Sequence, residues 1–213
     1  MMYLPDVFRE PRPDALHALI DSNGFATLIS PDPEDPVITH LPLLVDRDRG
    51  PHGTLIGHFA RANLHWRRLE QRPQALAVFH GPHGYISPSW YGEHPSVPTW
   101  NYTVVHAQGR ARLLHEPDAV ESIVRRLVAM YEGPRPDPWP MELPDEYRRA
   151  MLAGIVGLEI EITHLTGKFK LSQNRTPEDR RRVVAALQSG PPHEQELASL
   201  MSRLVLPGLD SNR

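Results

Sequence analysis

The chain has 213 residues, with 23 basic and 26 acidic side chains and a formal net charge of -3. This length suffices for one domain with a large buried core, and the balanced charge leaves no overall positive field to attract a nucleic acid. The absence of cysteine excludes disulfides and thiolate metal sites. No apolar run reaches the roughly 20 residues of a membrane span, and the N-terminus lacks a secretion signal, so we expect a cytoplasmic protein.

The first part of the chain is predicted to form a helix followed by short strands. A helix is expected over residues 13–21, because Leu16, Leu19 and Ile20 share one face. Apolar segments separated by turn-rich stretches predict strands over 25–30, 37–45 and 54–60, with turns at 31–36 and 46–53. Asn63 is a candidate N-cap for a helix that ends near Gln71. A strand over 75–79 follows.

The second part continues the strand pattern and then becomes helical. Strands are predicted over 85–87 and 99–114, and helices over 117–132 and 146–153. Strict apolar/polar alternation over 158–163 predicts a strand with one buried face. Thr176, Pro177 and two following acids predict a helix to about Gln188, and a last helix spans about 194–205. The expected fold class is therefore α+β, with a mostly antiparallel barrel and flanking helices.

Several common catalytic and nucleotide-binding patterns are missing. The chain has neither a dinucleotide-binding glycine motif, nor a phosphate-binding P-loop, nor a serine nucleophile elbow. It has twelve histidines but no paired zinc motif, and His80 and His83 are the most suggestive pair. We predict no metal site. His40, His58, His80 and His106 are expected to be half-buried, hydrogen-bonded side chains in or next to strands, unless one of them faces a ligand.

Three unusual segments, 57–63, 81–91 and 98–102, mix aromatic, hydroxyl and amide side chains. Arg61 precedes a predicted helix N-terminus, which would suit a phosphate, although an ordinary surface arginine explains its position equally well. Two interpretations of the aromatic residues stay open: they would either stack against the planar ring of a ligand or pack inside the barrel. These residues are Trp90, Tyr91, Trp100 and Tyr102.

The motifs at 40–42, 57–63, 85–91, 97–102 and 170–175 occur in one colinear order within residues 2–188. In this order they resemble the PaiB-like family of FMN-binding negative transcriptional regulators. The resemblance implies a split β-barrel related to pyridoxamine 5′-phosphate oxidases, with FMN in grooves between the subunits of a homodimer. It also implies an FMN-binding domain over 1–175 and a helical extension over 176–213 that packs on the barrel.

The same resemblance implies the cofactor site. Arg61 and Asn63 would address the FMN phosphate, His58 and Ala60 would line the groove, and Thr39 and His40 would approach from the neighbouring strand. The flavin pocket would be shaped by Ser87, Ser89, Trp90, Thr99, Trp100 and Asn101. The other subunit would contribute Lys170, Gln173, Asn174 and Arg175. No catalytic residue is assigned.

Regulation by direct DNA binding is not favoured by the sequence. The only dense basic group is Arg175 with Arg180 to Arg182, and the next predicted helix carries Glu194 and Glu196. A flavin-dependent sensor that acts through a partner, or indirectly through metabolism, would explain regulation as well as an operator-binding dimer does.

Two other functions stay open from the sequence. One is a pyridoxamine-phosphate-oxidase-like flavin oxidoreductase acting on a small substrate, with His58, His83 and Tyr85 as acid/base candidates. Lys168, Lys170 and Arg175 would then bind a substrate phosphate. The other is a structural dimer whose C-terminal helices bind partners.

Overall fold

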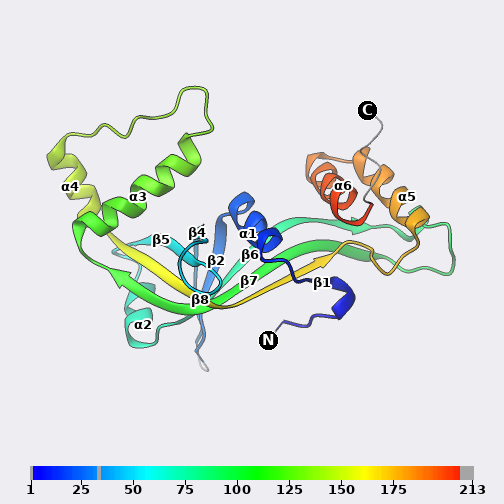
Figure 1. Ribbon diagram of the computed structural model, residues 1–213, viewed down its shortest axis with the longest axis horizontal. Coiled ribbons are helices and arrows are strands. Elements are labelled where there is room, and N and C mark those ends of the chain that lie inside the picture. Colours follow the sequence, from blue (N-terminus) through cyan, green and yellow to red (C-terminus); the bar gives the residue numbers. More distant parts are fainter. Residues whose placement is uncertain (1, 33–34, 207–213) are drawn as a thin grey trace. The chain divides into compact units, whose positions relative to one another are not determined.

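The computed structural model describes residues 2–32 and 35–206 (Figure 1). Part of the predicted turn at 31–36 and the end of the predicted extension, 207–213, lie outside the described residues. The elements are η1 Asp6–Phe8, β1 Arg9–Glu10, α1 Pro13–Ser22, β2 Phe25–Ser30, β3 Val37–Pro42, β4 Leu44–Asp46, β5 Thr54–Ala60, α2 His65–Gln71, β6 Gln74–Ile86, η2 Pro88–Trp90, β7 Thr99–Leu114, α3 Pro117–Glu132, α4 Asp145–Ala153, β8 Ile155–Lys170, α5 Pro177–Gln188 and α6 Pro192–Val205.

The eight strands form one sheet in the order β3-β2-β6-β7-β8-β5-β4, and β1 pairs with β8. The pairings of β1 with β8, of β2 with β3 and β6, and of β5 with β4 and β8 are all antiparallel. β3 and β4 are the two ends of this order, and within residues 2–32 and 35–206 no ladder joins them. The sheet is therefore open, and the predicted antiparallel α+β fold is confirmed.

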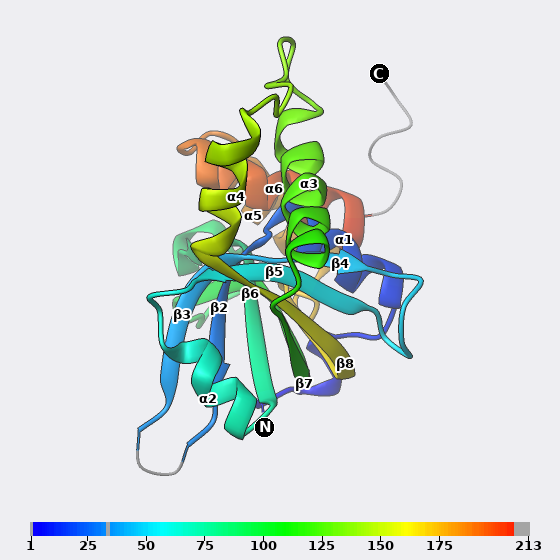
Figure 2. The ribbon, with the colours of Figure 1, turned by 90° about the vertical axis from the view of Figure 1, so that its left-hand side faces the viewer.

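The chain forms two compact units, to which β6, β7 and β8 contribute different parts. Unit 1 comprises residues 1–12, 80–105 and 166–213, and unit 2 comprises 13–79 and 106–165. In unit 2, α3 and α4 lie side by side (Figure 2), and α3 buries Val120, Ile123 and Leu127. In unit 1, α5 and α6 pack together and bury Leu187 and Leu197. The predicted domain boundary after residue 175 stays a prediction.

The predicted strand over 37–45 is wrong in one respect, because the structure contains two strands there. β3 pairs with β2, whereas β4 pairs with β5. Between them the buried Leu43 donates its backbone N–H to the Gly24 carbonyl at 2.8 Å. The chain therefore changes partner at Leu43, which an apolar run in the sequence does not reveal.

Three predicted strands are too short. The segments 75–79 and 85–86 belong to one strand, β6, which ends before Ser87. The predicted strand over 158–163 is part of β8, which extends from Ile155 to Lys170. Pro82 does not end β6, because a proline removes only one ladder hydrogen bond. Gly84 also lies within β6, and a Cβ there would lie 3.0 Å from Leu197 of α6. This glycine permits a close helix-to-strand approach.

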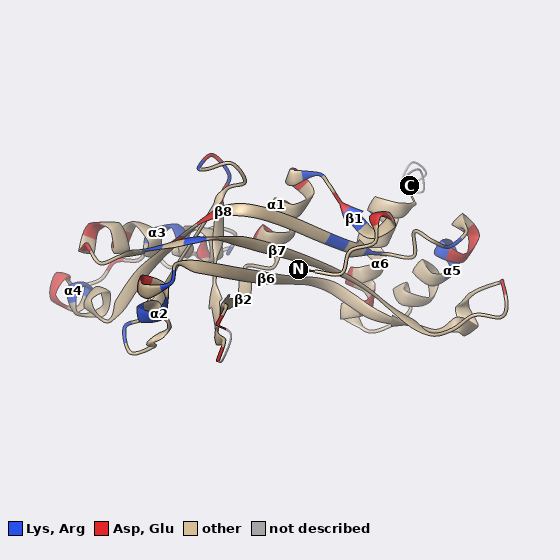
Figure 3. Cartoon of the chain, turned by 90° about the horizontal axis from the view of Figure 1, so that it is seen from below, with Lys and Arg blue, Asp and Glu red and all other residues tan. Residues whose placement is uncertain are grey.

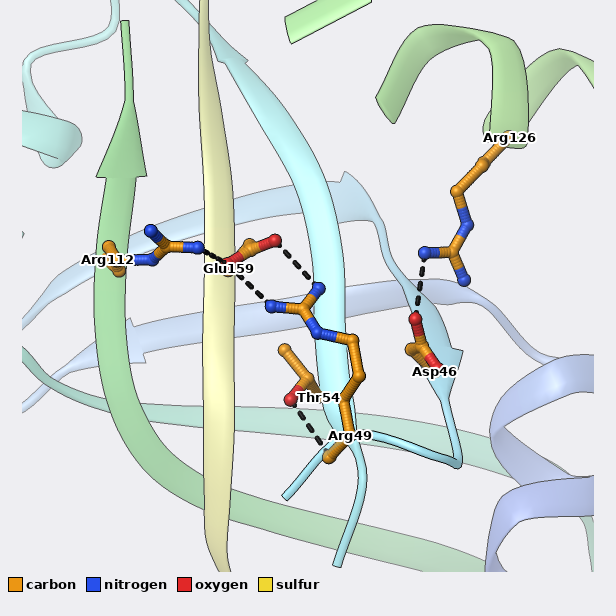
Figure 4. A network of polar contacts seen from close by, with 6 residues as sticks. All are labelled: Asp46, Arg49, Thr54, Arg112, Arg126 and Glu159. Carbon is orange, nitrogen blue, oxygen red and sulfur yellow. Dashed lines mark hydrogen bonds and ion pairs between the residues drawn. The ribbon is translucent and has the colours of Figure 1, made fainter. Parts of the chain in front are cut away.

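A network of ion pairs ties the β4–β5 turn to the sheet (Figure 4). Glu159 of β8 accepts hydrogen bonds from both Nη atoms of Arg49, at 2.8 and 3.0 Å, and it also pairs with Arg112 of β7. The hydrogen bonds from Arg49 lower the pKa of Glu159, and burial opposes them. Arg126 of α3 pairs with Asp46 of β4 at 2.9 Å. Charges from four separate segments thus hold one side of unit 2.

We expect Glu159→Gln to destabilise the protein by about 1–2 kcal/mol at neutral pH, because both arginines are substantially exposed. A lowered folded-state pKa gives stability that is present above the unfolded pKa and is lost as pH falls through the folded pKa. Urea unfolding at neutral and acidic pH should therefore show the difference from wild type shrinking in acid. A difference that does not depend on pH would contradict this account. Glu161→Gln, an exposed change two residues away, is the control.

Candidate functional site

A polar cluster fixes the turn between β5 and α2 in unit 2. His65 is 2% exposed, and its two ring nitrogens contact the hydroxyls of Ser30 and Thr39, both at 2.8 Å. Asn63 donates from Nδ2 to Thr39 Oγ1 at 3.1 Å and accepts the His65 backbone N–H at 3.0 Å. We call Ser30, Thr39, Asn63 and His65 the His65 cluster. It joins β2, β3 and the start of α2.

The electrostatics of the His65 cluster favour a neutral imidazole. Burial lowers the pKa of His65, and a neutral ring has one donor and one acceptor nitrogen. Sequence reasoning missed His65, and its only signal was its place two residues after Asn63. Asn63 was predicted as the N-cap, but the helix begins at His65 and the cap position is Leu64. Asn63 nevertheless serves the helix start through its side-chain oxygen.

Arg61 lies on the same turn and not at a helix N-terminus. Its guanidinium is exposed and donates from Nε to the Ala153 carbonyl at 2.7 Å and from Nη2 to the Ile155 carbonyl at 2.8 Å. Its Nη1 has no hydrogen-bond partner in the described parts of the chain. Two bonds to backbone carbonyls orient the group, and the remaining N–H donors stay available to an anion.

His58 and Ala60 lie on one face of β5, paired with Gly157 and Ile155 of β8. The Nδ1 atom of His58 is buried and has no hydrogen-bond partner among the described residues. Burial lowers the pKa of His58, and a hydrogen bond with the Phe59 backbone opposes it. An unsatisfied buried nitrogen is costly unless a ligand completes it.

Thr39 and His40 do not lie together. Successive strand residues point to opposite faces, and Thr39 joins the His65 cluster whereas His40 bonds Thr27 at 3.1 Å and stacks on Phe25. The structure therefore gathers Thr39 with Asn63 and leaves His40 on the other face of β3.

A second group of predicted residues surrounds the end of β8 in unit 1. Asn101 is fully buried and donates from Nδ2 to Ser172 Oγ at 2.9 Å, while its Oδ1 has no partner among the described residues. Ser172 has a φ of 64°, in the left-handed region that non-glycine residues rarely adopt. Gln173 closes the same turn, because its side chain accepts from Leu171 N at 2.7 Å and donates to the Phe169 carbonyl. Asn174 is exposed.

The loop after β6 carries the other predicted pocket residues. Ser87, the N-cap of η2, shares a hydroxyl hydrogen bond of 2.7 Å with Ser89 of η2, which ends at the half-buried Trp90. Arg175 places its guanidinium 4.2 Å from the ring centre of the buried Tyr91. Trp100 is 54% exposed and meets the edge of Tyr85 at 6.1 Å. Tyr91 therefore packs in the interior, whereas Trp100 presents its ring to solvent.

The first turn of α5 holds this loop. Asp179, which is 2% exposed and was not predicted as a site residue, accepts the Gly92 N–H through Oδ1 at 2.7 Å. Its own N–H donates to the N-cap Thr176 at 3.2 Å. The segment after η2 is thus anchored to a helix that is distant in sequence.

We expect Asp179→Ala to loosen the segment at Gly92 and to accelerate hydrogen exchange of its amide at least tenfold, because its acceptor is lost. Asp179→Asn keeps one carbonyl oxygen and should restore most of the protection. Glu178→Ala, on the same turn but exposed, is the matched control. Equal exchange in all variants would contradict the anchoring role.

The predicted residues thus form two groups, one in each unit. Among residues 2–32 and 35–206, no three His, Asp or Glu side chains are arranged to hold a metal ion. His80 and His83 are both exposed, and His83 contacts the Gly81 carbonyl. None of the described helices is long and apolar enough to cross a bilayer.

Comparison with known families identifies the chain. The family described as "Putative FMN-binding domain" matches residues 2–164. The chain belongs to this FMN-binding family. The predicted PaiB-like membership and FMN as the cofactor of the family are therefore confirmed.

Curated relatives of this FMN-binding chain include two that align over most of its length. The Bacillus subtilis (strain 168) "Protease synthase and sporulation protein PAI 2" is 36% identical over 203 residues, covering 94% of this chain and 96% of that protein. An uncharacterized Aspergillus fumigatus protein is 28% identical over 237 residues, covering 88% and 91%.

Solved structures share the fold. The flavocytochrome Anf3 from Azotobacter vinelandii has a TM-score of 0.60 at 16% identity, covering 82% of this chain and 75% of that chain. The FAD and heme binding protein from Mycobacterium smegmatis has a TM-score of 0.59 at 17% identity, covering 86% and 80%. These similarities confirm the predicted split-barrel fold.

The residues present in each unit fit FMN chemically. Unit 2 offers the exposed Arg61 guanidinium for a phosphate and the unsatisfied His58 Nδ1 for a polar ligand atom. Unit 1 offers the unsatisfied Asn101 Oδ1, an acceptor for a hydroxyl or ring N–H. Among the described residues, buried polar atoms without a partner also occur at Asp179 Oδ2 and Arg180 Nε, so this fit concerns chemical type alone.

Proposed function

We propose that this protein is an FMN-dependent negative regulator of transcription that works as a homodimer in the cytoplasm. The observation that carries the flavin part is the oriented, exposed guanidinium of Arg61, which lies on the same turn as Asn63, in a chain of the FMN-binding family. The regulatory part is supported by a relative that aligns over nearly the whole chain and whose name refers to sporulation.

In this proposal each residue group has a separate task. Arg61 holds the FMN phosphate, and Asn63, fixed by Thr39 and His65, maintains the turn that presents it. His58 completes its free Nδ1 with a polar atom of the cofactor. Asn101, Ser87, Ser89, Trp90, Thr99 and Trp100 contribute polar and aromatic contacts to the flavin. When bound, FMN supplies reversible one- or two-electron redox chemistry.

The proposed regulation does not use the C-terminal helices to read DNA. α6, the second helix of the pair, carries one Arg and two Glu. On α5, Arg181 and Arg182 pair with Glu178 at 3.2 and 3.4 Å, and Arg180 donates to the Val205 carbonyl at 2.8 Å. On α5, two acids in the first turn precede the three arginines, so both signs of charge lie at the start of this helix (Figure 3). This balance favours action through a partner protein that senses the flavin state, because a DNA-reading helix needs a net positive face.

The deciding experiment is a visible absorption spectrum of the purified protein, followed by titration with FMN and determination of its mass in solution. We expect flavin bands, or saturable FMN uptake, in a protein with the mass of a dimer. A colourless protein that takes up no FMN would contradict the proposal. Steady turnover of a reduced nicotinamide or of pyridoxamine phosphate would favour the oxidoreductase alternative, and salt-resistant, sequence-selective DNA binding would contradict action through a partner.

A further inference from the structure

Lys168 and Lys170 are the only two lysines among the 213 residues, and the other 21 of the 23 basic side chains are arginines. They are separated by one residue on β8, so both side chains leave the same face of the strand. Lys168 is 6% exposed, and Lys170 is half-buried. Both lysine side chains of this protein therefore lie on the same face of one strand, and all its other basic side chains are arginines.

Neither ammonium group has a carboxylate partner in the described part of the chain. Lys168 Nζ donates to the Tyr3 carbonyl at 3.0 Å and lies 5.0 Å and 5.4 Å from the ring centres of Tyr3 and Tyr102. Lys170 Nζ donates to the Trp100 carbonyl at 2.7 Å and to Thr99 Oγ1. Glu10, on the strand paired with this part of β8, is occupied by Arg12 at 2.8 Å.

No anionic side chain among the described residues neutralises the ammonium charges of Lys168 and Lys170. Removing an ammonium group from water is costly unless an anion compensates it, and burial together with the neighbouring Lys168 lowers the pKa of Lys170. An ammonium has three N–H donors, of which Lys168 uses one and Lys170 two. Donors therefore remain on both groups for one shared anion.

We propose that Lys168 and Lys170 form an anion site that binds the phosphate group of a small aromatic molecule. Lysine suits such a site as a compact point charge, as in phosphate-binding loops. The aromatic part is expected to lie against Trp100, whose exposed ring meets Tyr85 and whose carbonyl receives the Lys170 hydrogen bond. The phosphate comes either from FMN, in which case these lysines take the role proposed for Arg61, or from a second ligand.

Because the chain has no other lysine, amine acetylation read by mass spectrometry reports on this site directly. We expect inorganic phosphate at millimolar concentration to slow acetylation of Lys170 in wild-type protein, relative to chloride of equal ionic strength. Lys168→Met should abolish this protection. Arg9→Met removes an exposed cation on β1 directly opposite Lys168 and should leave the protection intact. Acetylation rates that phosphate does not change would overturn the proposal.

Titration with FMN and with riboflavin, which lacks the phosphate, identifies the source of the anion. If FMN supplies it, Lys170→Met should weaken FMN binding by about 10–100-fold and leave riboflavin binding unchanged. If a second ligand supplies it, both flavins should bind the variant as they bind wild type, and phosphate should still protect Lys170 in the FMN-loaded wild-type protein. If the protein takes up no flavin, FMN binding is refuted. Protection of Lys170 by inorganic phosphate still tests the anion site in that case.

Lys168→Met removes a cation that also anchors Tyr3, so its folding must be checked by circular dichroism and urea unfolding. Lys170→Arg provides a second variant that keeps the charge but changes its shape. We expect it to retain partial phosphate binding with lower affinity. Wild-type phosphate affinity in both Lys170→Met and Lys170→Arg would overturn the site even if Lys168→Met does not fold.

Discussion

Replacing Arg61 by alanine is expected to weaken FMN binding by about 100-fold, because a phosphate loses two charge-assisted hydrogen bonds. Riboflavin binding should change little, since riboflavin has no phosphate. Fluorescence quenching on titration with the two flavins measures both affinities. The effect is large because the bonds to Ala153 and Ile155 orient this guanidinium before any ligand arrives.

Two variants control for the other roles of Arg61. Arg67→Ala removes an exposed cation six residues away that lies over the Trp66 ring, and it should leave FMN affinity unchanged. Arg61→Lys keeps the charge and should recover only part of the affinity, since an ammonium cannot reproduce the planar arrangement of donors. Unchanged FMN affinity in folded Arg61→Ala would exclude the phosphate role.

The second large effect is expected at His65. His65→Leu should destabilise the protein by about 2–4 kcal/mol, because it leaves the hydroxyls of Ser30 and Thr39 without their buried partner. It should also weaken FMN binding, since Asn63 loses the neighbour that fixes its turn. Urea unfolding and FMN titration provide the two measurements.

The pH dependence distinguishes this role from simple packing. Burial depresses the folded-state pKa of His65, so the unfolded chain binds more protons between the folded and unfolded pKa values. The neutral ring therefore contributes stability that is full above the unfolded pKa of about 6.5 and declines as pH falls below it. His65→Leu should lose less stability than wild type over that range. An identical acid loss in wild type and His65→Leu would contradict the buried neutral ring.

Local chemistry in the sequence determined most of the elements. The expected helix over 117–132 and strand over 99–114 match α3 and β7 at both ends, because their periodicity and flanking residues are local signals. Thr176 caps α5 as expected. The family motifs determined the FMN-binding family and the split barrel, and they indicated Arg61 and Asn63 as site candidates, although their cofactor roles stay predictions.

Only the tertiary structure decided which candidates meet. His65 became a cluster residue because its partners lie 26 and 35 positions away in the chain, and Asp179 reached Gly92 across 87 positions. The pleat separated Thr39 from His40, and in the folded chain His58 Nδ1 is buried with no partner among the described residues. Sequence patterns determine the local conformation of each helix or strand and which of its faces is buried. Hydrogen-bond satisfaction, burial and charge compensation depend on which distant segments the folded chain brings together.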